Sequence, residues 1–136
     1  MNRFAVDVGP LVALLNARDS LHDWTKQTMD AIKPPLHTCE AVLSEACFLL
    51  RDVKGGADAV LELASRGILT LDFHLDSEVG PVRKLVARYA SVPMSLADAC
   101  LVRITEIDDK ITVITFDRDF HVYRRNGRQS IPVLMP

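Results

Sequence analysis

The chain has 136 residues, of which 49% are hydrophobic and 25% are charged, so it is long and apolar enough for one globular domain with a core. Its apolar runs fall short of the roughly 20 residues that cross a membrane. Its first residues also lack the basic region and apolar stretch of a signal peptide. The net charge of -2, from 16 basic and 18 acidic residues, gives no overall sign of nucleic-acid binding and does not exclude it.

Strand and helix signals alternate in the first part of the chain. Gly9-Pro10 is expected to start a helix, since proline is tolerated at the first helical position. Ser20 can cap a second helix, which Pro34-Pro35 ends before an extended segment. The predicted elements are, in order, a strand over 4–8, helices over 11–16 and about 21–32, and a strand over 36–38.

The rest of the chain continues this alternation. Val42, Ala46 and Leu49 recur at helical spacing, while Gly67 and Ser95 mark the end of one helix and the start of another. The predicted elements are, in order, helices over about 39–52 and 57–65, a strand over 68–71, helices from 76 or 77 to about 90 and over 96–107, a strand over 112–115, a polar turn over 116–123 and a strand over 131–134. Helices between strands predict one α/β domain over 1–136, with a parallel sheet and helices on both faces.

The three cysteines, Cys39, Cys47 and Cys100, lie in apolar contexts and are odd in number. We therefore expect reduced core residues in a cytoplasmic protein. Neither the cysteines nor His37 show the paired short spacings of a zinc site.

Two acidic residues follow apolar strands. Asp7 lies near the carboxyl end of the first strand, and Asp117 follows the strand over 112–115 in the same way. The carboxyl ends of parallel strands share one edge of a sheet, where open α/β sheets bind ligands, so these two carboxylates are expected to be neighbours. The alternative for Asp117 is an ordinary turn aspartate. Asp119, two residues on, is either a further ligand or a solvated acid.

Two further acids lie on predicted helices. Glu45 has apolar residues on all sides at helical spacing, so we expect it to face the side that packs on the sheet. The alternative is a glutamate at the rim of the core that reaches water. Asp98 also has apolar neighbours, but the spacing Ser95-x-x-Asp98 is that of a capping box. Asp98 is therefore a helix cap, a site residue or both.

Together these four acids predict a metal site. Two carboxylates ~5 Å apart repel by ~3 kcal/mol at an effective dielectric constant of ~20, and a divalent cation removes that repulsion. Oxygen ligands without convergent His or Cys favour Mg²⁺ or Mn²⁺, which commonly hold phosphate oxygens and activate water. Pooling four acids at one site would leave 16 basic and 14 acidic residues elsewhere, a net charge of +2.

The sequence resembles PIN domains, and more narrowly the ribonuclease toxins of VapBC-type toxin–antitoxin pairs. The resemblance rests on VDVGPLVALLNARDSLHDW at the start, TCEAVLSEACFLL in the middle and MSLADACLVRITEIDDKITVITFDRDFHVYRRNG near the end. It implies a PIN fold, a parallel sheet of four or five strands wrapped by helices, and cleavage of RNA phosphodiester bonds with Mg²⁺ or Mn²⁺. One departure is Val8, where relatives usually carry Thr or Ser after the first aspartate.

The resemblance also assigns roles to residues. The acidic quartet of the family falls on Asp7, Glu45, Asp98 and Asp117, and Thr115 and Asp119 match a polar and an acidic position beside it. The resemblance implies that Asp7, Asp98 and Asp117 hold a metal ion, while Glu45, with Asp119, orients water or a second ion. Water activated by the metal would attack the phosphorus in line and leave a 5′-phosphate.

The loop after Asp117 is the most basic stretch of the chain, and it predicts RNA contact. Its arginines would bind phosphates, and Tyr123 or His121 would stack on an unpaired base. The alternative is a solvated loop with Phe120 in the core. The positions assigned to RNA binding are Arg118, Tyr123, Arg124, Arg125 and Arg128.

Partners follow from the resemblance, which implies an RNA substrate, a homodimer and a cognate antitoxin protein, with no membrane partner. The alternative within the same fold is an RNA- or protein-binding regulatory module without turnover, which a missing acid would favour. A haloacid-type phosphatase needs an aspartate where Gly9 stands, and a receiver domain needs an acid pair that the sequence does not offer. Purely structural acids would make the stability independent of metal.

Overall fold

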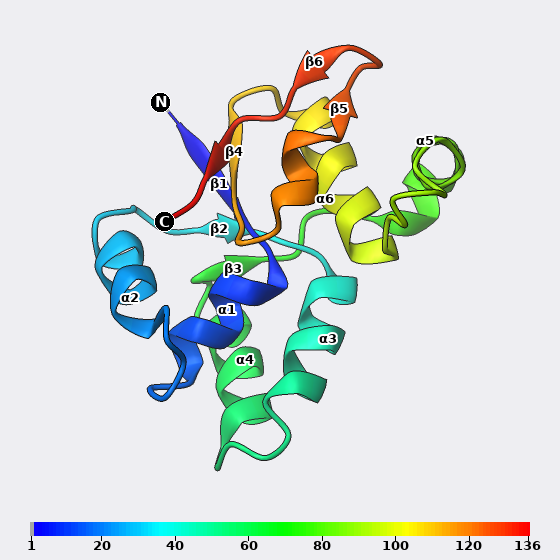
Figure 1. Cartoon of the computed structure of the whole chain (residues 1–136). Helices are drawn as coiled ribbons and strands as arrows, with labels where there is room; N and C mark the ends of the chain where they lie inside the picture. Colours follow the sequence, from blue (N-terminus) through cyan, green and yellow to red (C-terminus); the bar gives the residue numbers. More distant parts are fainter. Residues whose placement is uncertain (1) are drawn as a thin grey trace.

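The computed structural model describes residues 2–136, and its centre is a five-stranded parallel sheet in the order β3-β2-β1-β4-β7 (Figure 1). The strands are β1 (Arg3–Val6), β2 (Leu36–His37), β3 (Leu69–Thr70), β4 (Ile111–Ile114) and β7 (Val133–Leu134). β1 and β4 pair along their whole length, from Arg3 opposite Ile111 to Val6 opposite Ile114. A small antiparallel pair, β5 (Arg124–Arg125) and β6 (Gln129–Ser130), follows the short 3-10 helix η1 (Arg118–His121).

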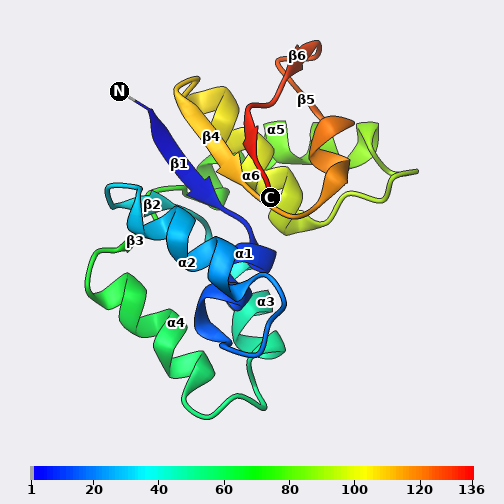
Figure 2. The ribbon, with the colours of Figure 1, turned by 60° about the vertical axis from the view of Figure 1, so that its left-hand side comes forward.

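Six helices flank this sheet on its two faces. They are α1 (Val8–Leu15), α2 (His22–Asp30), α3 (Glu40–Leu49), α4 (Gly56–Ser65), α5 (Leu75–Arg88) and α6 (Leu96–Ile107). The chain moves outward from β1 to β3 and then returns across the sheet to β4, so right-handed crossovers place α1 to α4 on one face and α5 and α6 on the other (Figure 2). The predicted parallel α/β architecture is confirmed. Within the described residues, no helix is both long enough and apolar enough to cross a membrane.

The core lies between the sheet and both helical layers. Ala5 and Val6 of β1, with Val113 and Ile114 of β4, are completely buried, as expected of central strands covered on both faces. Cys39 and Cys100 are buried, as expected of core residues, whereas Cys47 is half-buried; all three are free thiols.

The first strand and helix differ from the sequence-based prediction. β1 ends at Val6, and α1 begins at Val8, one turn earlier than expected. The reason is that Asp7 caps the helix, with its Oδ1 accepting a hydrogen bond from the backbone N–H of Val8 at 2.7 Å. Pro10 still lies in the first turn, where no backbone donor is needed. The expected Ser20 cap of α2 is also wrong, because that helix begins after Leu21 without a side-chain cap.

Candidate active site

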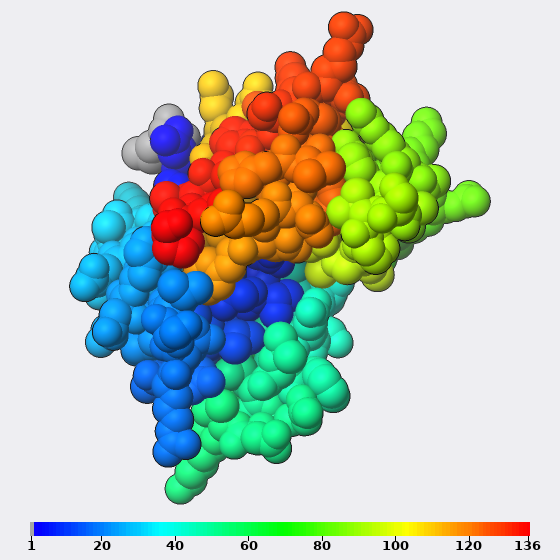
Figure 3. Space-filling view, in the orientation of Figure 1, coloured from blue at the N-terminus to red at the C-terminus, as the bar shows by residue number. Residues whose placement is uncertain are grey.

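The four predicted acids line one cavity of about 470 Å³. We call it the acidic cavity; its walls are Asp7, Val8, Gly9, Glu45, Leu49, Ser95, Asp98, Phe116 and Asp117. In Figure 3 the dark-blue start of α1 lies at its floor, between the orange residues that follow β4 and the aqua residues of α3. Residues far apart in the sequence therefore meet at one concave surface.

The position of the acidic cavity follows from the topology of the sheet. β1 lies between β2 and β4, and the connections that leave β1 and enter β4 run on opposite faces. This arrangement opens a crevice at the carboxyl ends of the two strands, which is the usual ligand site of open α/β sheets. Asp7 and Asp117 follow β1 and β4 at this edge, as the sequence predicted.

Asp7 is the most buried of the four acids, with 6% of its surface exposed. Its Oδ1 accepts from the N–H of Val8 and its Oδ2 accepts from the hydroxyl of Thr115, both at 2.7 Å. Burial raises the pKa of Asp7 to about 6, and the charges of Asp98 and Asp117 add to that effect, while the two hydrogen bonds oppose it. The ionised form of Asp7 is therefore held at a cost in free energy.

Thr115 ties the ends of β1 and β4 together. Its buried hydroxyl donates to Asp7 and accepts from the backbone N–H of Asp117 at 3.0 Å. One side chain thus orients both strand-end acids. These two hydrogen bonds give a structural role to Thr115, the polar residue that was predicted to lie beside the acids.

Asp98 combines the two roles that the sequence left open. Its backbone N–H donates to Ser95 Oγ at 3.0 Å, so Ser95 caps α6 as predicted. Its carboxylate faces the acidic cavity, and Oδ2 accepts from the hydroxyl of Tyr123 at 3.0 Å. Burial raises the pKa of Asp98, with a further contribution from the charge of Asp117.

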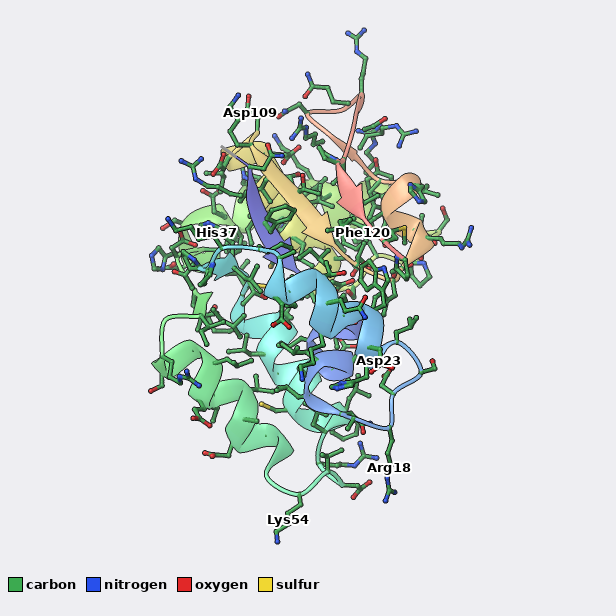
Figure 4. The ribbon with its side chains drawn as sticks, turned by 90° about the vertical axis from the view of Figure 1, so that its left-hand side faces the viewer. Arg18, Asp23, His37, Lys54, Asp109 and Phe120 are labelled. Carbon is green, nitrogen blue, oxygen red and sulfur yellow. The ribbon has the colours of Figure 1, made fainter. Side chains whose placement is uncertain are left out.

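The predicted stacking of Tyr123 on RNA is wrong, because this side chain is completely buried. Its ring packs edge-on between Tyr89 and Phe120, with centroid distances of 5.1 and 5.2 Å. Phe120 lies on the inner side of η1, toward the sheet (Figure 4), and is buried in the core, as the alternative for this loop had it. Phe120 lies within η1 and Tyr123 follows the end of that helix, and the contact between their rings brings both side chains into the core.

Two of the predicted RNA-binding arginines hold the loop instead. Nη1 of Arg124 donates to the carbonyls of His121 and Tyr123, at 2.7 and 3.0 Å, and Nη1 of Arg125 donates to the carbonyl of Asp109 at 3.2 Å. Both arginines are half-buried. One guanidinium nitrogen of each arginine therefore stabilises the loop backbone, and phosphate contact by these two arginines stays a prediction.

Glu45 does not face the sheet, which corrects the prediction from its apolar neighbours. Val42, Leu43 and Ala46 form the buried side of α3, so Glu45 is exposed at the rim of the acidic cavity. Leu49 beside it is 49% exposed, which shows that apolar neighbours on a helix need not mark its buried face. The rim position that the sequence left as the alternative is the one observed.

Asp117 likewise combines a turn role with a place in the cavity wall. Its Oδ1 accepts from the backbone N–H of Asp119 at 2.9 Å and caps η1. The walls of the acidic cavity include Asp117 but, among the described residues, not the half-buried Asp119.

The donor chemistry of the acidic cavity suits a hard divalent cation. The four carboxylates supply oxygen ligands, and none of them forms an ion pair with a basic side chain of residues 2–136. Their mutual repulsion contributes to the raised pKa of Asp7. In the described part of the chain, no three His, Cys, Asp or Glu side chains already converge closely enough to enclose an ion. Each aspartate is instead held by protein donors.

Comparison with known proteins identifies the family of this fold. The sequence profile of the PIN domain matches residues 4–126, and the chain belongs to that family. Among solved structures, it is similar to the crystal structure of Mycobacterium tuberculosis VapC20, described as a sarcin-ricin loop cleaving toxin. The two share a TM-score of 0.76 and 23% sequence identity, over 88% of this chain and 93% of that chain, so they share the fold. No curated protein matches the sequence.

Proposed function

We propose that this protein is a metal-dependent ribonuclease and the toxin of a toxin–antitoxin pair. The observation that carries the proposal is the acidic cavity, where carboxylates from four separate elements gather without a basic partner. Several uncompensated carboxylates are a poor structural choice, since each raises the cost of ionising the next. They are a suitable choice where a cation and a phosphodiester have to be held together.

Asp7, Asp98 and Asp117 would hold Mg²⁺ or Mn²⁺. When bound, such an ion neutralises the acids, lowers the pKa of water and stabilises the charge that develops on phosphate. The hydroxyl of Thr115 holds the carboxylate of Asp7, and the backbone N–H of Asp119 holds that of Asp117, so protein donors already orient both carboxylates. Preset ligands avoid reorganisation when the substrate binds.

Glu45 would act on water rather than as a buried ligand. Its carboxylate is exposed at the rim of the acidic cavity, where it can accept a hydrogen bond from a water molecule that approaches the phosphodiester. No histidine or serine lies in position to serve as a nucleophile in this cavity among the described residues, apart from Ser95, whose oxygen caps α6. The geometry therefore favours hydrolysis by water.

The substrate and partners are proposed from the family and from the shared fold. VapC20, which has the same fold, is described as cleaving the sarcin-ricin loop, and this supports RNA as the substrate class. We propose in addition a homodimer, a cognate antitoxin that occupies the acidic cavity, and action in the cytoplasm. Expression of this chain should then arrest growth, and co-expression of a small neighbouring gene should relieve the arrest.

The direct test is cleavage of total RNA with Mg²⁺ or Mn²⁺ and with EDTA. We expect wild-type protein to cut only with the metal, while Asp98→Asn and Glu45→Gln lose activity. Glu62→Gln is the matched control, because Glu62 is exposed on α4 outside the acidic cavity. If Asp98→Asn cleaves RNA as well as the wild type does, the nuclease assignment is refuted. RNA binding without cleavage by the wild type would favour a regulatory module.

A further inference from the structure

A second cavity of about 500 Å³ adjoins the acidic cavity. We call it the basic cavity; its walls include Leu21, Phe116, Arg118, His121, Val133 and Met135. Phe116 belongs to the walls of both cavities and comes directly before Asp117. In Figure 3 the basic cavity lies where the blue residues ahead of α2, the orange residues after β4 and the red C-terminal residues meet. One aromatic ring therefore separates an acidic from a basic compartment.

The polar groups of the basic cavity are available for a ligand. The side chains of Arg118 and His121 are exposed, and neither forms a hydrogen bond or ion pair with a side chain or backbone group in residues 2–136. Arg124 and Arg125, in the same loop, are already bound to carbonyls. Of these three arginines, only Arg118 lines the cavity, and a guanidinium group can bind phosphate in a bidentate manner.

Two neighbouring residues hold the side chain of Phe116 in place. Trp24 contacts it edge-on, with 5.8 Å between the ring centroids. Gly9 also lies against the ring, since a Cβ added there would come within 2.9 Å of Phe116 Cδ2. The ring is thus a supported platform, and unpaired nucleobases stack on such platforms with about 1–3 kcal/mol per base.

We propose that the basic cavity is a nucleotide subsite for single-stranded RNA, next to the phosphodiester held at the acidic cavity. The base of this nucleotide would stack on Phe116 against the apolar wall of Leu21 and Val133, and Arg118 would bind its phosphate. The volume of the cavity falls within the usual range of small-ligand sites, roughly 300–1,000 Å³. This inference rests on the proposed ribonuclease function, because it places the strand across Phe116 into that site.

Binding measurements without metal test the subsite separately from catalysis. The probe is a short fluorescein-labelled single-stranded RNA of mixed sequence, followed by anisotropy in EDTA, so that no cleavage occurs. We expect Arg118→Gln to weaken binding about tenfold and to reduce the salt dependence by roughly 0.7 of a unit slope. Phe116→Leu should weaken single-stranded binding about tenfold and leave binding of the matching duplex nearly unchanged.

Arg66→Gln is the matched control, because Arg66 is an exposed arginine that follows α4 and lines neither cavity. Equal weakening by Arg66→Gln and Arg118→Gln would overturn the subsite, since binding would then depend on overall charge. Competition by a short polyglutamate peptide as strong as that by RNA would also overturn it, because the site would then take anions in general. If wild-type protein cuts RNA but Arg118→Gln binds normally, the subsite fails and the ribonuclease stands. If wild-type protein neither binds nor cuts RNA, both proposals fail.

Discussion

Replacing Asp7 with asparagine should stabilise the protein while removing its activity. Burial and the neighbouring acids raise the pKa of Asp7 from 3.8 to about 6, a difference of about 2 pKa units. That difference corresponds to about 3 kcal/mol of unfavourable free energy in the folded state when Asp7 is ionised. Asparagine carries no charge and is as good an N-cap as aspartate.

The expected gain is smaller than the whole electrostatic cost. The side-chain oxygen of asparagine can still accept the hydrogen bond from the N–H of Val8. Its NH₂ group then faces Thr115, so the hydroxyl proton of Thr115 loses its acceptor. Losing one such hydrogen bond costs about 1 kcal/mol. Asp7→Asn should therefore raise the free energy of unfolding by about 2 kcal/mol near neutral pH without divalent metal, or roughly 5–10 °C in melting temperature.

The advantage of asparagine should depend on pH in a defined direction. Because the folded state holds the proton of Asp7 more tightly than the unfolded state, acidification relieves the cost in wild type as the pH falls from about 6 toward 3.8. The difference in free energy of unfolding between Asp7→Asn and the wild type should reach its maximum above about pH 6 and vanish below pH 3.8. Ion pairs elsewhere, such as that of Arg103 with Glu78, also depend on pH, but they are present in both proteins. Their contribution therefore cancels when the free energies of unfolding of the two proteins are subtracted.

The assay is thermal unfolding followed by circular dichroism across this pH range, with and without Mg²⁺. Asp109→Asn serves as the control, because Asp109 is exposed at the opposite end of β4 from the acidic cavity (Figure 4) and should melt like the wild type. Mg²⁺ should stabilise the wild type more than Asp7→Asn. A variant that melts below the wild type near neutral pH, with no change in the gap on acidification, would refute the reasoning.

Three further substitutions probe the contacts that orient the acids. Tyr123→Phe removes the hydroxyl that donates to Asp98, so the affinity for Mn²⁺, measured by calorimetry, and the rate of RNA cleavage should both fall. Tyr89→Phe is the control: it removes a buried hydroxyl of the same aromatic cluster, which accepts from a backbone N–H, and it should change neither quantity. Thr115→Val should cost about 1–3 kcal/mol in chemical denaturation, since it leaves the N–H of Asp117 without its partner, and a neutral result would show that water replaces the hydroxyl. Ser95→Ala should cost about 1 kcal/mol by removing the cap of α6, and an unchanged melting temperature would contradict that role.

The fold was largely predictable because its signals are local. Apolar strands such as β4, the glycine at position 67 and the Ser95 cap are each readable within a few residues of sequence. Alternation of strand and helix then leaves few topologies, since parallel strands need right-handed crossovers. The same logic placed Asp7 and Asp117 at one edge of the sheet.

The side-chain environments were not predictable in this way. Glu45 was expected to face the sheet and instead lies at a rim, because the packing of α3 depends on which neighbours cover it. Tyr123 was expected at the surface and is buried, because its partners Tyr89 and Asp98 lie 34 and 25 residues away in the sequence. Such contacts appear only when distant segments are brought together.

Periodicity and strand ends were enough to predict a parallel α/β architecture and the acids that it brings to one edge of the sheet. The way in which those acids are held depends on contacts between distant parts of the chain. Thr115 meets Asp7 across 108 residues of sequence, and that bond, with the burial that raises the pKa of Asp7, exists only in the folded chain. Desolvation and hydrogen-bond geometry depend on neighbours in space, and the periodicity of a sequence does not specify those neighbours.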